Sequence, residues 1–397
     1  MTIADAGTVE ALVVELVAAR STNPPGDERA VADVVERAAQ QLGLPPGRRI
    51  AARPERPNLL FEIGQGTPRL LLAAHMDTMP PGDLDAWNGD PWAVRHDGDR
   101  LIGLGIADMK ASIAAMLHAA ARLQEDPPRN GTLVLAFTAD EEAGSADGMA
   151  WLCANGAIVA DAAIMTEPSS VGPTSWSSLF VAQRGSCISE LVARGRPGHS
   201  AEAVDSAERA GWALARALSA LLEGDPFRGC EHPVDGTTPT VNVATMVRGG
   251  EVPFAHPAEL RATIEVRTLP GQTADGVRAA LRRVIDEAGL SGRATIEAPR
   301  DGLGWIPAGQ TVIDERLLGA ARAAWRAVLA AEPREAVLPA GTDSSHVDAL
   351  GIPALPTFGP GTLAVAHRPE ESIDAADLSR AVDLFESVAR HYLEGSR

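Results

Sequence analysis

The segment LLLAAHMDTMP, residues 70–80, constrains the fold more than any other part of the chain. Its apolar half has the composition of a strand that is buried on both faces of a sheet. The run ends at His75, Met76 and Asp77 and is followed by a proline turn. An imidazole and a carboxylate are costly at the end of a buried strand unless they pair with each other or bind a ligand. We therefore expect either a satisfied core pair or a functional site here.

Similar apolar runs alternate with helical periodicities along the first part of the chain. The pattern predicts helices at about 27–43 and 109–124, and strands at about 58–63, 69–75 and 132–138. Strands that alternate with helices form largely parallel sheets that are covered by helices. The predicted fold class is therefore α/β, with a mixed, largely parallel sheet sandwiched by helices.

A different order of elements interrupts this pattern between residues 179 and 299. A strand is followed by a helix (202–223), two strands (240–248 and 259–268), a helix (273–289) and a final strand. This βαββαβ order suits a small α+β domain with helices on one face of its sheet. The α/β pattern resumes afterwards, which indicates an inserted domain. The predicted bounds are 1–178 and 300–397 for the larger domain and 179–299 for the insertion.

The acidic composition limits the partners that the chain is expected to bind. Lys and Arg number 35 against 53 Asp and Glu, so the formal net charge is −18, and the acids are dispersed. Such a surface favours neither nucleic acid nor an anionic membrane. No apolar run reaches the ~18 residues that a membrane-spanning helix needs. We expect a small-molecule substrate.

The cysteines bear on the compartment. Cys153, Cys187 and Cys230 are widely spaced and form no CxxC pair, which indicates neither a disulfide framework nor a thiolate metal site. The N-terminal segment MTIADAGTVEALVVELVAAR carries acids early and is typical of an amphipathic helix rather than a signal peptide. We therefore expect a cytoplasmic protein.

Acidic and imidazole side chains recur where the predicted strands of the larger domain end. They are His75, Asp77, Asp108, Glu141, Glu142, Glu167 and His367. Open α/β sheets bind ligands beyond the carboxyl ends of their strands, so we expect these residues to converge although they are far apart in sequence. Imidazoles and carboxylates without thiolates suit one or two divalent ions of the zinc class, with open positions for water.

Charge favours two ions over one. Asp108, Glu142 and Glu167 as ligands carry three negative charges, which two dications and one bridging hydroxide balance to zero. Adjacent Glu141 and Glu142 cannot both face one ion from an extended chain, so one can bind metal while its neighbour acts as a base. Asp77, two residues after His75, has the parity to face the same side and hold the imidazole tautomer.

The chain carries an ordered set of motifs along nearly its whole length. They are STNPPGDE, HMDTMPPGD, GLGIADMK, ADEEAGS, TEP, GRPGHSA, TPTVNV with RGG, and FGPG with AHRPEE. As a set they resemble the dizinc metallopeptidase family that includes acetylornithine deacetylase, succinyl-diaminopimelate desuccinylase and glutamate carboxypeptidase. The resemblance implies hydrolysis of an amide bond of a small N-acyl amino acid or dipeptide-like substrate.

The resemblance also implies a cofactor and a role for each residue of the cluster. The cofactor is a pair of Zn2+ ions, with Co2+ or Mn2+ as possible substitutes. In the implied arrangement Asp108 bridges the ions, His75 and Glu167 complete one site, Glu142 and His367 complete the other, and Glu141 is the general base. The family further implies a cis peptide between Asp108 and Met109.

By the same resemblance, residues 179–299 form a lid that also makes a homodimer. The lid carries His199 and Asn242 toward the substrate, and we expect His199 of one subunit to reach the other subunit's site. Candidate substrate residues are Asn242, Arg267, Gly341 and His346.

Several positions depart from the family's pattern. Leu104 stands where arginine is usual, Ala111 and Ser112 replace small glycines, and no asparagine precedes Pro257. His346 occupies the place where several desuccinylases carry a substrate-binding arginine. These departures concern the choice of substrate and leave the metal ligands intact.

Structural alternatives remain open for most of these residues. His75 and Asp77 could form a core pair, and Glu141 and Glu142 could lie in a solvated loop. His199 could be a capping or surface group, and Asn242 a structural strand residue. Arg267 could pair with Glu265 or another acid of the lid rather than anchor a substrate carboxylate. His118 lies in an Ala-rich helical pattern and is expected to be a packing residue.

Three classes of function compete. A hydrolase is favoured because the expected base, Glu141, is present together with every expected ligand. The alternative is a noncatalytic binding or assembly protein on the same fold, in which loss of the base or of a ligand is expected. A nucleotide-dependent oxidoreductase is least favoured, since GLGIAD does not match GxGxxG; no GxSxG or HExxH motif supports another hydrolase type.

Overall fold

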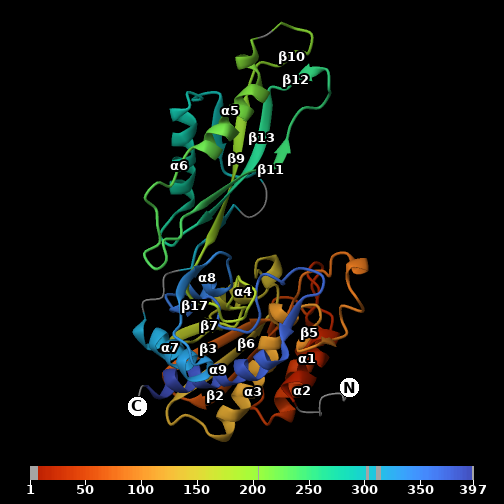
Figure 1. Ribbon diagram of the computed structural model, residues 1–397, viewed down its shortest axis with the longest axis vertical. Coiled ribbons are helices and arrows are strands. Elements are labelled where there is room, and N and C mark those ends of the chain that lie inside the picture. Colours follow the sequence, from red (N-terminus) through yellow and green to blue (C-terminus); the bar gives the residue numbers. More distant parts are fainter. Residues whose placement is uncertain (1–7, 204, 301–303, 310–313, 396–397) are drawn as a thin grey trace. The chain divides into compact units, whose positions relative to one another are not determined.

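The computed structural model describes residues 8–203, 205–300, 304–309 and 314–395. The chain divides into two compact units, each described here by itself (Figure 1). The first unit comprises Met1–Ala182, Gln310–Ala336 and Thr342–Arg397. The second unit comprises Gln183–Gly309 and Val337–Gly341.

A six-stranded sheet forms the centre of the first unit, in the order β1-β2-β6-β3-β7-β17. The strands are β1 (Arg48–Ala51), β2 (Pro57–Gln65), β6 (Gly131–Thr138), β3 (Arg69–His75), β7 (Ala162–Met165) and β17 (Ala354–Leu355). The four strands from β6 to β17 are parallel, whereas β1 and β2 pair antiparallel at one edge. The predicted α/β class with a mixed, largely parallel sheet is therefore confirmed.

Helices cover both faces of this sheet (Figure 1). One face carries α1 (Val9–Ala18), α2 (Arg29–Gln41), α3 (Ala111–Glu125), α7 (Glu315–Leu329) and α9 (Ala375–Glu394). The other face carries α4 (Met149–Ala154) and α8 (Ser344–Asp348). Alternate residues of β3 point to opposite faces of the sheet. Leu71 and Ala73 pack with α4 and α8, whereas Leu70 and Leu72 point to the opposite layer.

A small antiparallel sheet lies beside the central one and consists of β4 (Arg95–Asp97), β5 (Arg100–Ile102) and β18 (Ser372–Asp374). Ser372 pairs with Ile102, and the backbone N–H of Gly103 donates to the carbonyl of Glu371 at 3.0 Å. This pairing brings the segment before α9 next to the turn before α3, which contains Asp108.

The second unit has an antiparallel sheet in the order β11-β13-β9-β14. Its strands are β9 (Gly185–Arg194), β11 (Thr240–Arg248), β13 (Glu259–Thr268) and β14 (Ala294–Glu297). Helices α5 (Ala210–Glu223) and α6 (Ala274–Glu287) pack on the sheet through an apolar core. Short strands β10 (Gly198–His199) and β12 (Ala255–His256) pair with each other, and β15 (Trp305–Ile306) pairs with β9. Strand β8 (Leu179–Gln183), which lies mostly in the first unit, pairs with β16 (Glu335–Leu338).

The helix predicted at 202–223 begins later than expected, at Ala210. The Asp205 side chain accepts the N–H of Ala207 and starts a separate 3-10 turn (Ser206–Glu208), and Arg209 is extended. The hydrophobic pattern of a helix does not reveal that a nearby side chain will hydrogen-bond to the backbone and delay the start of the helix. Among the described residues, no helix combines the length and the apolar character that crossing a bilayer requires.

Candidate functional site

The parallel strands β3, β6 and β7 end at the same edge of the central sheet, and polar side chains follow each of them. His75 is the last residue of β3 and is in register with Thr138 near the end of β6. Glu141 and Glu142 follow β6 in the 3-10 turn η3 (Glu141–Ala143), and Glu167 follows β7. The register of the sheet therefore gathers these groups, as ligand sites in open α/β sheets require.

Asp108 lies in the turn η2 (Ile106–Lys110) that leads into α3. The Asp108–Met109 peptide is cis, as the family resemblance implies. The buried Glu371 carboxylate accepts the backbone N–H groups of Gly105, Ala107 and Asp108 at 2.8, 2.8 and 3.0 Å. These hydrogen bonds fix the turn that presents Asp108.

The two oxygens of the Asp108 carboxylate face different imidazoles. Oδ1 lies 3.0 Å from Nε2 of His75, and Oδ2 lies 3.2 Å from Nε2 of His367. Glu167 Oε1 is 3.3 Å from the His75 Nε2, and Glu142 Oε2 is 3.1 Å from the His367 Nε2. Potential ligand atoms thus form two sets of three, each within 4.8 Å, and both sets contain Asp108.

The buried carboxylates of the cluster favour a positive charge among them. Burial, together with the neighbouring charge of Asp108, raises the pKa of Glu167 to about 7. Hydrogen bonds to Asp108 and Glu142 raise the pKa of His367 to about 11. Burial opposes the charged form of His75, but the surrounding carboxylates outweigh it and raise the pKa of this imidazole. Crowded buried carboxylates favour a positive charge among them.

Asp77 holds the turn that carries the adjacent glutamates. Its carboxylate accepts the backbone N–H groups of Glu141 and Glu142, both at 3.1 Å. Nδ1 of His75 lies 3.0 Å from the Asp77 carbonyl oxygen and 3.5 Å from the carboxylate. The backbone of Asp77 is therefore the nearer partner of the imidazole, whereas sequence parity suggested the side chain.

Glu141 and Glu142 have different surroundings although they are adjacent. Glu142 faces His367, and its Oε1 also accepts the backbone N–H of Met79 at 3.2 Å. Glu141 belongs to neither set of potential metal ligands. Burial, above all, raises the pKa of the Glu141 carboxyl well above its usual range, and the charges of Glu167 and Asp343 add to the rise.

Four of the residues expected at the site belong to the second unit: His199, Asn242, Arg267 and Gly341. His199 lies in strand β10, not at a helix N-terminus, and its Nδ1 accepts the N–H of Ala201 at 3.1 Å. Asn242 donates to Glu265 at 3.2 Å, and Nε of Arg267 pairs with the same carboxylate at 2.9 Å. The ion pair that was the alternative for Arg267 is thus present within this unit.

His346 lies in α8 of the first unit, and burial lowers the pKa of its imidazole. Asp343, at the start of this helix, is buried and accepts the hydroxyl of Ser145. Burial raises the pKa of the Asp343 carboxyl to about 7. Asp343 and Glu371 were not predicted as site residues, although Glu371 ends the AHRPEE motif and Asp343 stands three residues before His346.

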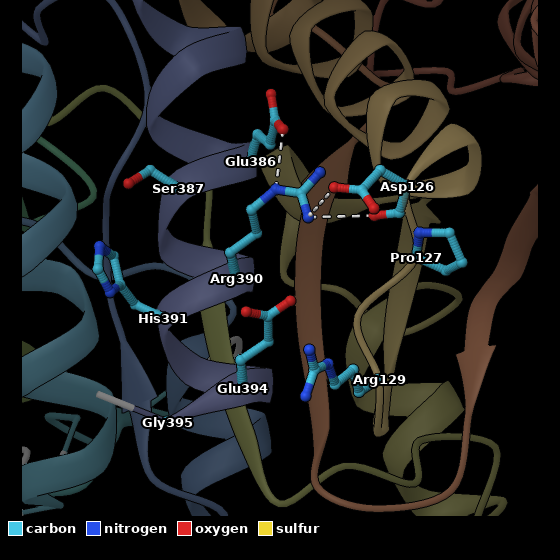
Figure 2. Close-up of a pocket in the computed structure, with 9 residues that line it drawn as sticks. All are labelled: Asp126, Pro127, Arg129, Glu386, Ser387, Arg390, His391, Glu394 and Gly395. Carbon is cyan, nitrogen blue, oxygen red and sulfur yellow. Dashed lines mark hydrogen bonds and ion pairs between the residues drawn. The ribbon is translucent and has the colours of Figure 1, made fainter. Parts of the chain in front are cut away.

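A separate hollow lies on the first unit between α9 and the segment after α3 (Figure 2). Nε of Arg390 donates to Glu386 at 2.9 Å, and the same guanidinium pairs with Asp126 at 3.3 Å (Figure 2). None of the residues predicted for the site is among those that line this hollow. The hollow is therefore distinct from the cluster of potential metal ligands.

Comparisons with known proteins agree with this architecture. The sequence profile of Peptidase family M20/M25/M40 matches residues 71–391. A succinyl-diaminopimelate desuccinylase of Stenotrophomonas maltophilia is 29% identical over 344 residues, which are 85% of this chain and 87% of the relative. An N-acetyl-L-citrulline deacetylase of Xanthomonas campestris pv. campestris is 31% identical over 331 residues, or 80% of this chain and 81% of the relative.

A solved structure supports the fold independently. The M20 family metallo-carboxypeptidase Sso-CP2 from Sulfolobus solfataricus superposes with a TM-score of 0.72 at 20% sequence identity. The superposition covers 97% of this chain and 99% of that one, so the likeness extends to both units. Because the family's profile spans most of the sequence, the chain belongs to peptidase family M20/M25/M40.

Proposed function

We propose that this family member is a metal-dependent hydrolase that cleaves the amide bond of a small N-acyl amino acid or dipeptide-like substrate. One observation carries the proposal: the two oxygens of Asp108 face His75 and His367 separately, which gives two ligand sets that share one carboxylate. A carboxylate that two ligand sets share in this way would suit a pair of metal ions.

The residues of the cluster fit such a pair. His75 and Glu167 would hold one ion, Glu142 and His367 the other, and Asp108 both. The donors are imidazole nitrogens and carboxylate oxygens without thiolates, a set that suits Zn2+ and also accepts Co2+ or Mn2+. Three carboxylates in a largely buried cluster exceed the charge of one dication, which favours two.

When bound, the metal pair supplies a Lewis acid for the substrate carbonyl and lowers the pKa of a water molecule toward 7. Glu141 acts as the base: its carboxylate takes a proton from the attacking water and passes it to the leaving amide nitrogen. Asp77 orients Glu141 through the backbone of the turn. Burial raises the pKa of the Glu141 carboxyl, and a more basic carboxylate is a better proton acceptor.

The surroundings of the site bear on which acyl group the substrate carries. The relatives include a desuccinylase and a deacetylase, whose names differ in whether the acyl group carries a second carboxylate. Burial lowers the pKa of His346, so this side chain is neutral near pH 7 and offers no counterpart to an arginine for a second carboxylate. We therefore favour an uncharged acyl group such as acetyl, with Asn242, Arg267, Gly341 and His346 near the substrate.

The second unit is proposed to be the lid and the dimerisation domain. Strand β11 is at the edge of its sheet and exposes Met246 and Val247, with exposed fractions of 49% and 57%. An unpaired edge with apolar side chains favours association with a second copy. In this homodimer, His199 of one subunit stabilises the negative charge that develops on the carbonyl oxygen in the other subunit's site.

A cytoplasmic location completes the proposal. Cys153, Cys187 and Cys230 are free, and the first two are buried. Unpaired cysteines are typical of a reducing compartment.

The function is tested by loading the purified protein with Zn2+, Co2+ or Mn2+ and assaying N-acetyl, N-succinyl and N-formyl amino acids together with dipeptides. We expect turnover of N-acyl amino acids, with acetyl preferred over succinyl. The Glu141→Gln protein, which keeps the ligands, serves as the control for contaminating hydrolases. A protein that binds two metal ions but hydrolyses no member of the panel would support the binding-protein alternative.

A further inference from the structure

The side chain of Arg56 is almost completely buried in the first unit, with an exposed fraction of 3%, although it belongs to neither set of metal ligands. Its guanidinium pairs with Glu28, which is 0% exposed, and with Asp140, which is 4% exposed. Nη2 also donates to Oδ1 of Asn23 at 3.2 Å. A buried cation therefore joins the segment before β2 to the segment that follows β6.

Asn23 continues this connection to the site. Its Nδ2 donates to Asp77 at 2.9 Å and to Asp140 at 3.1 Å. Asp77 in turn accepts the backbone N–H groups of Glu141 and Glu142. Asp140 directly precedes Glu141 in the chain, so Arg56 reaches the turn of Glu141 by two routes, through Asp140 and through Asn23 with Asp77.

The backbone of this turn needs such support. Asp140 and Ser145 have φ values of 66° and 60°, and Gly144 between them has a φ of 103°. Non-glycine residues with positive φ are held in a sparsely populated conformation and persist only where the surroundings fix them. Asp140 is fixed by Arg56, and its Oδ2 accepts the N–H of Asp147 at 3.1 Å.

A stabilising role alone gives a poor account of this arrangement. Buried ion pairs are often no more stabilising than apolar residues of similar volume, since each charge loses its hydration. Their advantage lies in fixing one geometry, and the geometry fixed here is that of the turn with Glu141. Gly26 supports the same conclusion: it packs so closely on Arg56 that a Cβ at this position would overlap the guanidinium.

We propose that Arg56 is a positioning residue for Glu141, acting through Asp140 and through Asn23 with Asp77. The inference rests on the proposed role of Glu141 as base. In this inference Arg56, a buried arginine outside the metal cluster, fixes the position of the Glu141 carboxylate. It does not control metal binding.

The first test is Arg56→Gln, with kcat, KM, metal content and hydrogen exchange of the amides of residues 141–147 as readouts. A displaced catalytic group typically costs on the order of 10²-fold, so we expect kcat to fall by about that factor. KM should change less than about threefold, since the base adds little ground-state binding. Metal content should stay at the wild-type level, and the amides should exchange faster. Arg56→Lys, which keeps the charge, should recover part of kcat.

Arg261→Gln is the matched control. Arg261 is 9% exposed and pairs with Glu190, also buried, in the second unit. Its loss also removes a buried guanidinium, so a general loss of stability should be comparable. We expect wild-type kcat and wild-type exchange of residues 141–147 in this variant. If Arg261→Gln lowers kcat as much as Arg56→Gln does, the positioning role is refuted.

A second variant displaces Arg56 without removing a charge. Gly26→Ala places a Cβ against the guanidinium, at a φ of +78°. Gly43→Ala is its control, because Gly43 has a φ of +74° but nothing within 4 Å of the added Cβ. We expect Gly26→Ala to lower kcat and speed exchange of residues 141–147, and Gly43→Ala to do neither. This pair remains informative if Arg56→Gln does not fold.

The outcomes separate this inference from the proposed function. If the wild-type protein hydrolyses nothing on the panel, the proposed function fails, and the exchange data alone then decide whether Arg56 fixes the turn. Wild-type exchange of residues 141–147 in both Arg56→Gln and Gly26→Ala refutes the inference, whatever the activity. Loss of metal in proportion to kcat also refutes it, because Arg56 would then support the ligands rather than the base.

Discussion

One oxygen of the Glu371 carboxylate accepts the backbone N–H of Asp108 at 3.0 Å, although 263 positions separate the two residues. The same carboxylate accepts the N–H groups of Gly105 and Ala107, so three backbone donors converge on a single buried side chain. Glu371 therefore determines how Asp108 is presented to both imidazoles.

Glu371→Gln tests this relationship. The amide replaces one acceptor oxygen with an NH2 group, which faces a backbone donor and cannot bond to it. Loss of a group that orients a metal ligand typically costs about 10–100-fold in metal affinity. We expect a loss of that order, measured by titration against a competing chelator. Glu370→Gln is the control, because Glu370 pairs with Arg95 and Asn88 instead, and an equal loss in this variant would contradict the assignment.

The adjacent glutamates should respond oppositely to substitution. Glu142 faces His367 in one ligand set, so Glu142→Ala should lower metal content and activity together. Glu141→Gln should keep both ions and lose kcat by about 10²–10⁴-fold, with little change in KM. Metal per subunit, measured by elemental analysis beside kcat, checks both. A metal-depleted Glu141→Gln protein, or a fully loaded one that is still active, would mean that Glu141 is not the base.

Removing the metals should destabilise the first unit as well as abolish turnover. Without cations, the carboxylates of Asp108, Glu142 and Glu167 are left close together, and burial raises the pKa values of both glutamates. A ligand that binds only the folded state at 100 times its Kd contributes about 2.7 kcal/mol to the free energy of unfolding. We expect a difference of this order between chelated and Zn2+-loaded protein in urea titrations. Glu142→Ala should show a smaller difference, and an equal one would argue against the ligand role of Glu142.

The fold was more predictable than the contacts that shape the site. Strands β2, β3 and β6 fall within about two residues of their predicted bounds, because apolar runs with turn residues at their ends record burial directly. The converging ligand residues were likewise expected from their positions at strand ends, and the structure gathers them in one cluster. Their role as ligands stays a prediction.

The supporting residues could not be predicted in the same way. Arg56 and Asp140 pair across 84 positions, and nothing in the sequence near Arg56 differs from a surface segment with an arginine. The same holds for Glu371, which occupies an acidic pair in AHRPEE with one member partly exposed and one buried. Periodicity records which residues are buried, but not which distant polar group satisfies a particular buried charge. Helix α5 shows a related limit, since local capping by Asp205 overrides its helical pattern.

His118 predicts a pH dependence that lies away from the cluster. Burial, followed by the charge of Arg122, lowers the pKa of this imidazole below its usual 6.5. Because the unfolded chain binds the proton more tightly, the stability that neutral His118 provides is present above about pH 6.5 and is lost as the pH falls through the folded-state value. We expect the unfolding free energy of His118→Gln, relative to that of the wild type, to rise as the pH is lowered from about 8 to about 5. Equal pH profiles of unfolding free energy would contradict this.

The proposed homodimer predicts that two variants, each inactive alone, regain activity when their subunits form mixed dimers. His199→Ala removes the group donated to the partner's site, and Glu141→Gln removes the base of its own site, so each homodimer should be nearly inactive. After subunit exchange, half of the dimers in an equal mixture are mixed, and each of these has one intact site. Recovered activity should therefore approach about a quarter of the wild-type value. Mixing Glu141→Gln with Glu142→Ala is the control, because both defects lie in the same subunit's site and no mixed dimer has an intact one. If exchange is verified by mass spectrometry of differently labelled subunits and the first mixture stays inactive, His199 does not act across the interface.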